Sequence, residues 1–191
     1  MKKLNRVFLF GFLLILIAGC SKLEIQPDPL SSSDESALKS AKTKNITMGF
    51  NIVSTGNYDF NGPSDICGEF PPMVRVINTG EGTGTHFGKL THYFDFCVDI
   101  RDSSYPNNHW VGYFEDENGD RLNVLLAGNV LPGRVPGMPN FATSYFKDPF
   151  EIVGGTGRFE GATGGGMTND YNSSKDDNSH HHWKGKITLV K

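Results

Sequence analysis

Residues 90–100 read Leu-Thr-His-Tyr-Phe-Asp-Phe-Cys-Val-Asp-Ile, and apolar and polar side chains alternate along this stretch. Successive side chains of a β-strand point to opposite sides, so a period of two predicts a strand with one buried face. The polar face carries Thr91, Asp95 and Asp99. The face predicted to be buried carries Leu90, Phe94, Phe96, Val98 and Ile100, and the same parity adds His92 to it.

Two further segments, 45–52 and 183–190, alternate in the same way. The inward positions that we assign across the three segments are Met48, Phe50, Leu90, Phe94, Phe96 and Ile187. A composition typical of strands also marks residues 73–78, 110–115, 121–128, 143–153 and 158–163, with Gly and Pro between them. About eight such strands without a long amphipathic helix predict an all-β domain, either an antiparallel barrel or a sandwich.

A glycine-rich segment precedes the last predicted strand. Residues 154–164 read Gly-Gly-Thr-Gly-Arg-Phe-Glu-Gly-Ala-Thr-Gly, which resembles the G-G-T-G-x-F-x-G-A-x-G signature of dirigent proteins and allene oxide cyclases. This resemblance implies an antiparallel, eight-stranded, closed barrel of the calycin type over residues 45–191. Glycine lets a backbone turn or approach a neighbour, so we expect a structural role for Gly154, Gly155, Gly157, Gly161 and Gly164. Phe159 and Ala162 would then fill the barrel.

The resemblance implies the fold of these families but not their catalytic activity. Allene oxide cyclases cyclise a fatty-acid-derived epoxide and dirigent proteins steer phenolic radical coupling, both inside the barrel and without a cofactor. Their functional residues lie in motifs that this sequence does not match, so we predict no catalytic residue and no cofactor. A dinucleotide-binding loop is the rival interpretation of the glycines. It needs a following helix, whereas the residues after Gly161 are Gly-rich and polar.

The first residues have the layout of a secretory signal. Basic Lys2, Lys3 and Arg6 precede an apolar run from Val7 to Ile17, and Ile-Ala-Gly-Cys follows at residues 17–20. This layout resembles bacterial lipoproteins, those of Bacteroidetes included, in which cleavage before the cysteine is coupled to its acylation. We therefore predict a signal peptide over residues 1–19, a lipidated Cys20, and a flexible tether, rich in Ser and charged residues, over 20–44. The apolar run is too short for a transmembrane anchor.

This signal predicts a protein of the cell envelope, anchored by its lipid to a membrane that we expect to be the outer one. Whether it faces the periplasm or the cell surface stays open, as does its oligomeric state. The formal net charge is −3, with 18 basic and 21 acidic residues scattered along the chain. Because no basic stripe is present in the sequence, we predict no nucleic-acid partner.

Cys67 and Cys97 form an even pair once Cys20 carries lipid, in a compartment that permits disulfides. A disulfide between them is our prediction, and two free thiols are the main alternative. No Cys/His spacing typical of a protease or a metal site supports a catalytic thiol. We also see no Ser/His/Asp order and no paired inward carboxylates.

Two segments are rich in residues that can bind metal ions, but their residue patterns favour a hairpin turn and a polar loop. Residues 116–120 read Asp-Glu-Asn-Gly-Asp, where the acidic spacing suits calcium but the Gly position does not, so we expect a hairpin turn with positive φ at Asn118 and Gly119. Three consecutive histidines, residues 180–182, cannot easily bind one ion from a strand, so we expect a polar loop there. We predict no metal.

His92 is one of very few polar residues at the predicted inward positions. It is either a core histidine with a hydrogen-bond partner or a polar contact for a ligand in an internal cavity. We predict a non-catalytic, membrane-anchored barrel that binds a small apolar ligand or a partner. The alternative function is a cofactor-free isomerase or cyclase that acts inside the barrel.

Overall fold

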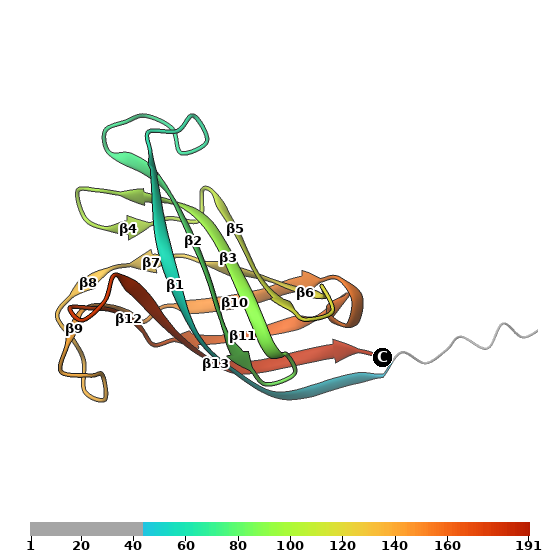
Figure 1. The fold of residues 1–191 in the computed structure, drawn as a ribbon. Helices are drawn as coiled ribbons and strands as arrows, with labels where there is room; N and C mark the ends of the chain where they lie inside the picture. Colours follow the sequence, from blue (N-terminus) through green and yellow to red (C-terminus); the bar gives the residue numbers. More distant parts are fainter. Residues whose placement is uncertain (1–43) are drawn as a thin grey trace, which may run out of the picture. The chain divides into compact units, whose positions relative to one another are not determined.

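Eight antiparallel strands close into a barrel in the computed structural model, which describes residues 44–191 (Figure 1). Around the ring, the strands are β1 (Asn45–Gly62), β2 (Met73–Gly84), β3 (Gly88–Asp99), β5 (Trp110–Asp116), β6 (Arg121–Leu126), β10 (Pro149–Gly155), β11 (Thr163–Thr168) and β13 (Asn178–Val190). β13 pairs with β1 from Asn45↔Val190 to Asn57↔Asn178 and closes the ring. The predicted all-β, eight-stranded closed barrel is confirmed.

Five short strands lie outside the ring. They are β4 (Ser104–Tyr105), β7 (Gly128–Asn129), β8 (Leu131–Pro132), β9 (Ala142–Phe146) and β12 (Asp170–Ser173). β12 pairs with the first part of β13 and with β9, so it extends the sheet at the end of the barrel away from Lys191 (Figure 1). The described residues contain one 3-10 turn, η1 (Gly157–Phe159), and no helix among them is long and apolar enough to span a membrane.

Aromatic side chains pack the interior of the ring. The Trp183 ring stacks on Phe94 with centroids 5.5 Å apart, meets Phe114 edge-on at 5.1 Å, and lies 4.8 Å from Phe150. At the end of the barrel near Lys191, Phe159 stacks on Phe87. The predicted inward positions are confirmed, since Phe50, Leu90, Phe94, Phe96 and Ile187 are buried and Met48 packs against them.

The outer face of β3 departs from the predicted alternation. Ile100, predicted to be inward, follows the end of β3 and is 54% exposed. Asp95 and Asp99, predicted to be exposed, are buried. Arg75 binds both carboxylate oxygens of Asp95 at 2.8 and 2.6 Å, and Arg101 binds Asp99 in the same way. A carboxylate can be buried when it is paired with an arginine, because the ion pair offsets the cost of removing the charge from water. The alternation of apolar and polar residues in the sequence does not show which carboxylates are paired.

Two predicted strands have other boundaries. Residues 143–153 form β9 and β10 rather than one strand, with a break at Lys147 and Asp148. Residues 158–162 are not part of a strand, because η1 and a following turn at Glu160 and Gly161 occupy them before β11 begins at Thr163. Gly157, at φ +54°, starts this turn with a backbone conformation that a strand cannot adopt.

Candidate functional site

The glycine-rich segment forms the tight connection between β10 and β11. A Cβ on Gly155 would lie 2.1 Å from the backbone oxygen of Arg121, and one on Gly157 would lie 1.8 Å from Asp120 Oδ1. The backbone therefore needs glycine at both positions. Gly154 and Gly161 also have positive φ, and Gly164 packs against the Lys186 carbonyl. Phe159 and Ala162 are buried in the core, as the resemblance implies.

Residues 116–120 connect β5 to β6 as a hairpin turn. Asp116 Oδ1 accepts the backbone N–H groups of Asn118 and Asp120 at 2.8 and 3.1 Å, and its Oδ2 accepts from Arg158. The carboxylate that would begin a calcium loop is thus occupied. Only Gly119 has positive φ, so the prediction of positive φ at Asn118 is wrong. The turn instead begins with a Gly119 N–H to Asp116 carbonyl bond of 3.0 Å.

A disulfide joins Cys67 and Cys97, whose Cα atoms are 5.5 Å apart. Cys67 lies in the loop between β1 and β2, and Cys97 lies on β3. Both cysteines are buried, so this loop folds over the outer face of β3. Cys20 lies outside the described residues.

The three histidines at 180–182 are part of β13, not of a loop as predicted. Strand alternation turns His181 inward and leaves His180 and His182 on the outer face. Outside, His180 stacks on Tyr171 at 4.6 Å and contacts Asp176 at 3.1 Å. Among the described residues, no group of three His, Cys, Asp or Glu side chains could hold a metal ion.

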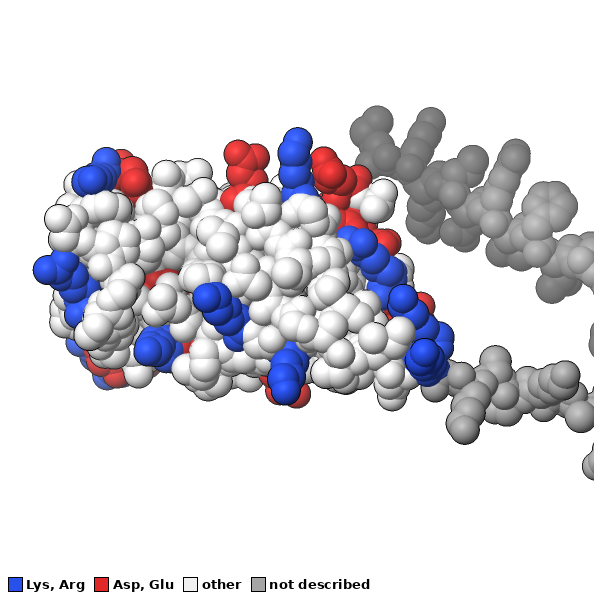
Figure 2. Space-filling model, turned by 90° about the horizontal axis from the view of Figure 1, so that it is seen from below, with Lys and Arg blue, Asp and Glu red and all other residues white. Residues whose placement is uncertain are grey.

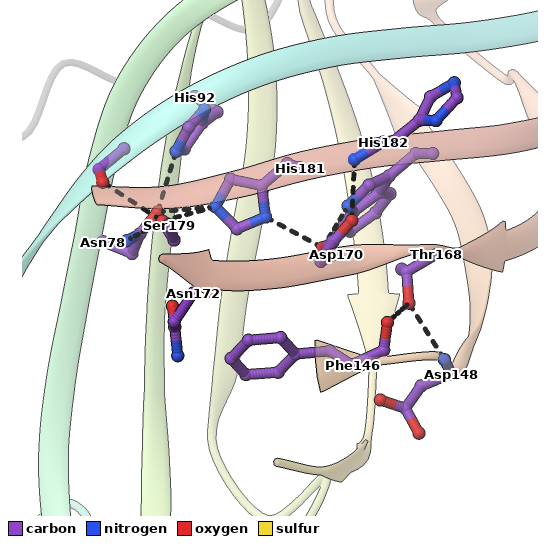
Figure 3. A network of polar contacts seen from close by, with 12 residues as sticks. Asn78, His92, Phe146, Asp148, Thr168, Asp170, Asn172, Ser179, His181 and His182 are labelled. Carbon is purple, nitrogen blue, oxygen red and sulfur yellow. Dashed lines mark hydrogen bonds and ion pairs between the residues drawn. The ribbon is translucent and has the colours of Figure 1, made fainter. Parts of the chain in front are cut away.

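Inside the barrel, His181 is the centre of a buried polar network, which Figure 3 shows. Its Nδ1 donates to Asp170 Oδ2 over 2.8 Å, and its Nε2 lies 2.8 Å from Ser179 Oγ and 3.2 Å from Asn78 Oδ1. Asp170 also accepts from Trp183 Nε1 at 2.9 Å and from the backbone N–H of His182 at 2.7 Å. We call Asn78, His92, Asp170, Ser179 and His181 the inner network.

The inner network has the order of a serine nucleophile, a histidine base and an orienting aspartate, which the sequence did not predict. Its hydrogen bonds argue for a structural role. Ser179 Oγ donates to the Gly56 carbonyl at 3.1 Å and accepts from Asn78 Nδ2 at 2.8 Å. Ser179 Oγ also lies within hydrogen-bond distance of His181 Nε2, so its hydrogen-bonding capacity is used within the protein. Ser179 is 0% exposed, and a nucleophile must reach its substrate.

His92 belongs to the inner network as a core histidine with a hydrogen-bond partner. Its ring stacks on Phe94, and its Nε2–H donates to Asn78 Oδ1 over 2.8 Å. Burial lowers the pKa of His92 to about 2, with a smaller contribution from the neighbouring His181. The His92 ring is therefore neutral in the folded protein. His92 Nδ1 is buried without a hydrogen-bond partner among the described residues.

A second polar pair lies beside the inner network. The Tyr105 hydroxyl donates to Asp148 Oδ2. Figure 3 shows the second contact of Asp148, whose backbone N–H donates to Thr168 Oγ1 at 2.9 Å. Burial raises the pKa values of Asp148 and Tyr105. Asp148 is half-buried beside Tyr105, whereas Asp170 is buried within the inner network. Each already accepts hydrogen bonds from neighbouring protein groups.

The interior leaves little free space. The gap between the aromatic core and the inner network, lined by residues such as Tyr58, Trp110 and His181, has a volume of about 30 Å³. One water molecule occupies about this share of liquid volume. This volume is far below the roughly 300 to 1,000 Å³ of usual ligand pockets, and the small apolar ligand expected in the interior stays a prediction.

A larger hollow lies on the outer face of the sheet, over β1, β2, β3 and β5. It has a volume of about 640 Å³, and we call it the outer groove. A second hollow of about 450 Å³ adjoins it over β1, β2, β12 and β13 and shares two residues with it, Thr55 and Glu81. The side chains and backbone that line the outer groove belong to Thr55, Asn57, Thr79, Gly80, Glu81, Thr91, His92, Tyr93, Tyr113, Glu115 and Asn178.

Charge is dispersed on the face that Figure 2 draws, where Lys and Arg alternate with Asp and Glu across uncharged surface. Such a face lacks the field of one sign that attracts a polyanion. Comparison of the chain with protein-family models, curated proteins and solved structures finds no match.

Proposed function

We propose that this chain is a lipid-anchored protein of the cell envelope, attached through an acylated Cys20, and that its barrel is a non-catalytic binding module. The interior holds about 30 Å³ of free space, whereas ligand pockets usually measure roughly 300 to 1,000 Å³. The outer groove lies within that range. This contrast carries the proposal that binding takes place on the outer face rather than inside the barrel.

The enzyme alternative would need room for a substrate beside His92 or His181. The small volume of the interior gap and the hydrogen bonds that Ser179 and His181 already make argue against such a space. We further propose that the resemblance to allene oxide cyclases and dirigent proteins concerns the scaffold. The closed barrel and the glycine turn between β10 and β11 support a shared scaffold, whereas the cyclase and coupling activities have no matching residues here.

Anchoring is tested by metabolic labelling of cells with a fatty acid. We expect the parent protein to carry label and the Cys20→Ser variant to accumulate as an unlabelled precursor. Label retained by the variant at the parental level would end the lipoprotein proposal.

The binding face is tested by a photoreactive side chain placed in the full chain. One variant carries it at Thr79, in the outer groove, and the control carries it at Glu151, exposed on β10 on another wall of the barrel. We expect light-dependent adducts on cells from Thr79 only. Equal adducts from both positions, or none from Thr79, would contradict the proposed binding face.

A further inference from the structure

The outer groove lies between two aromatic pairs. Cross-strand pairing places Tyr93 beside Tyr113 on β3 and β5, and Tyr171 beside His180 on β12 and β13. Both pairs are stacked, with centroids 5.5 and 4.6 Å apart and ring planes within 19° and 5° of each other. Two strands, β1 and β2, run between the pairs, so three strand spacings, roughly 14 Å, separate β3 from β13.

One ring face of the first pair remains for a ligand. Arg121 places its guanidinium 4.3 Å from the Tyr113 centroid and covers that ring on the side of β6. Tyr93 stacks on Tyr113 with one face, which leaves its second face on the side of β2 and the outer groove. In the second aromatic pair, His180 lines the adjoining hollow of about 450 Å³ and lies opposite Thr55 of β1.

The floor between the aromatic pairs consists of short polar side chains in register. Thr55 lies opposite Glu81, Asn57 lies opposite Thr79, and Thr91 lies opposite Glu81 on the next strand. These side chains are exposed. Their hydroxyl and amide groups both donate and accept hydrogen bonds, and the carboxylate of Glu81 accepts them. Because they are shorter than the rings on either side, the surface is hollow at this point.

From these observations we propose that the outer groove binds a neutral oligosaccharide. A sugar ring presents C–H groups that pack on an aromatic face and a rim of hydroxyls that need donors and acceptors, and the outer groove offers both. Its carboxylates, Glu81 and Glu115, disfavour a phosphate- or uronate-bearing chain. Glu115 is held by Arg121, so Glu81 is the carboxylate left to accept sugar hydroxyls. This inference rests on the proposed function, which it deepens by naming the ligand class.

The test uses the full chain, purified in detergent, on an array of neutral and acidic oligosaccharides, followed by calorimetry with the strongest neutral binder. We expect Tyr93→Ala and Glu81→Gln to weaken binding on the order of tenfold or more, because each removes a central contact. The matched controls are Phe60→Ala and Glu151→Gln, whose side chains are exposed outside the outer groove. All four variants should melt at the parental temperature.

Salt dependence separates a sugar from a cationic peptide. Affinity for a neutral oligosaccharide should hardly change between low and high ionic strength, whereas a peptide bound through Glu81 would weaken as salt screens the charge. No binding to any neutral oligosaccharide, equal binding by Tyr93→Ala, or salt-sensitive capture of a basic peptide instead would each overturn the inference. If the photoreactive Thr79 variant still gives adducts, the proposed function stands without it. If neither experiment detects binding, both fail.

Discussion

The rings of His92 and His181 meet edge to face inside the barrel, with centroids 5.0 Å apart. Each Nε2 lies within hydrogen-bond distance of the same acceptor, Asn78 Oδ1, at 2.8 and 3.2 Å. Two histidines from distant parts of the chain thus share one amide. Burial is the main cause of the low pKa of His92, and the neighbouring His181 adds to it.

We expect stability to fall as pH drops below about 6.5. The pKa of His92 is about 2 in the folded protein, against an ordinary value of 6.5. Between these two pH values His92 is therefore protonated in the unfolded chain and neutral in the folded chain. Stability present above pH 6.5 is therefore lost progressively down to about pH 2. Between pH 7 and pH 5 this one group should cost about 2 kcal/mol. Urea titrations at both pH values measure the difference.

The His92→Phe variant isolates this contribution from those of the other titratable groups that line the interior gap, which are Tyr58, Tyr105, Asp170 and His181. Phe keeps the stack on Phe94 and removes the titrating nitrogen. Its stability should change less between pH 7 and pH 5 than that of the parent. An identical change in both proteins would show that His92 is not the cause.

Asp170→Asn should destabilise the protein by about 2 to 4 kcal/mol. Asp170 is 3% exposed and accepts from His181, Trp183 and the His182 backbone, and an amide cannot satisfy all of these donors. The control is Asp176→Asn, which removes the more exposed carboxylate beside His180 and should cost at most about 1 kcal/mol. Equal urea midpoints for the two variants would show that the inner network does not stabilise the barrel.

Gly157→Val should destabilise the barrel by about 1 to 3 kcal/mol or prevent folding. The residue has φ +54°, and its added Cβ would collide with Asp120. Gly49→Val is the matched control, because no atom lies within 4 Å of a Cβ there and its φ is not positive. Thermal melts compare the two. A Gly157→Val variant that melts like the parent but loses binding would assign this segment to the ligand site instead.

Replacing both Cys67 and Cys97 by Ser should lower the melting temperature by several degrees. The disulfide spans 30 residues, and the chain-entropy model gives roughly 3 to 4 kcal/mol for such a loop. A reductant should lower the parent's melting temperature and leave that of the double variant unchanged. Two titratable thiols per folded, non-reduced chain would contradict the bond.

Part of the inner network could have been predicted. Ile187 belongs to the predicted inner face, and the same parity carried back along the strand makes Trp183, His181 and Ser179 inward as well. The prediction stopped at Trp183 because three consecutive histidines are typical of a polar loop. Asp170 gave no such signal, since it lies in a polar stretch whose strand is only four residues long.

The sequence alone determined the all-β class, most of the strands and most of their inward faces. Those features depend on neighbours in the chain, because alternation follows from backbone geometry. The need for glycine at residue 155 depends instead on the close approach of the Arg121 backbone from β6. The tertiary structure decided which polar side chains meet in the inner network and where the outer groove lies. Asn78 and His181 are 103 residues apart and meet only because β13 closes on β1. Whether the interior is hollow depends on the summed volume of side chains from all eight strands, which no single segment encodes. Those volumes fill the barrel and leave the larger hollow outside, where tall aromatic pairs flank short polar residues.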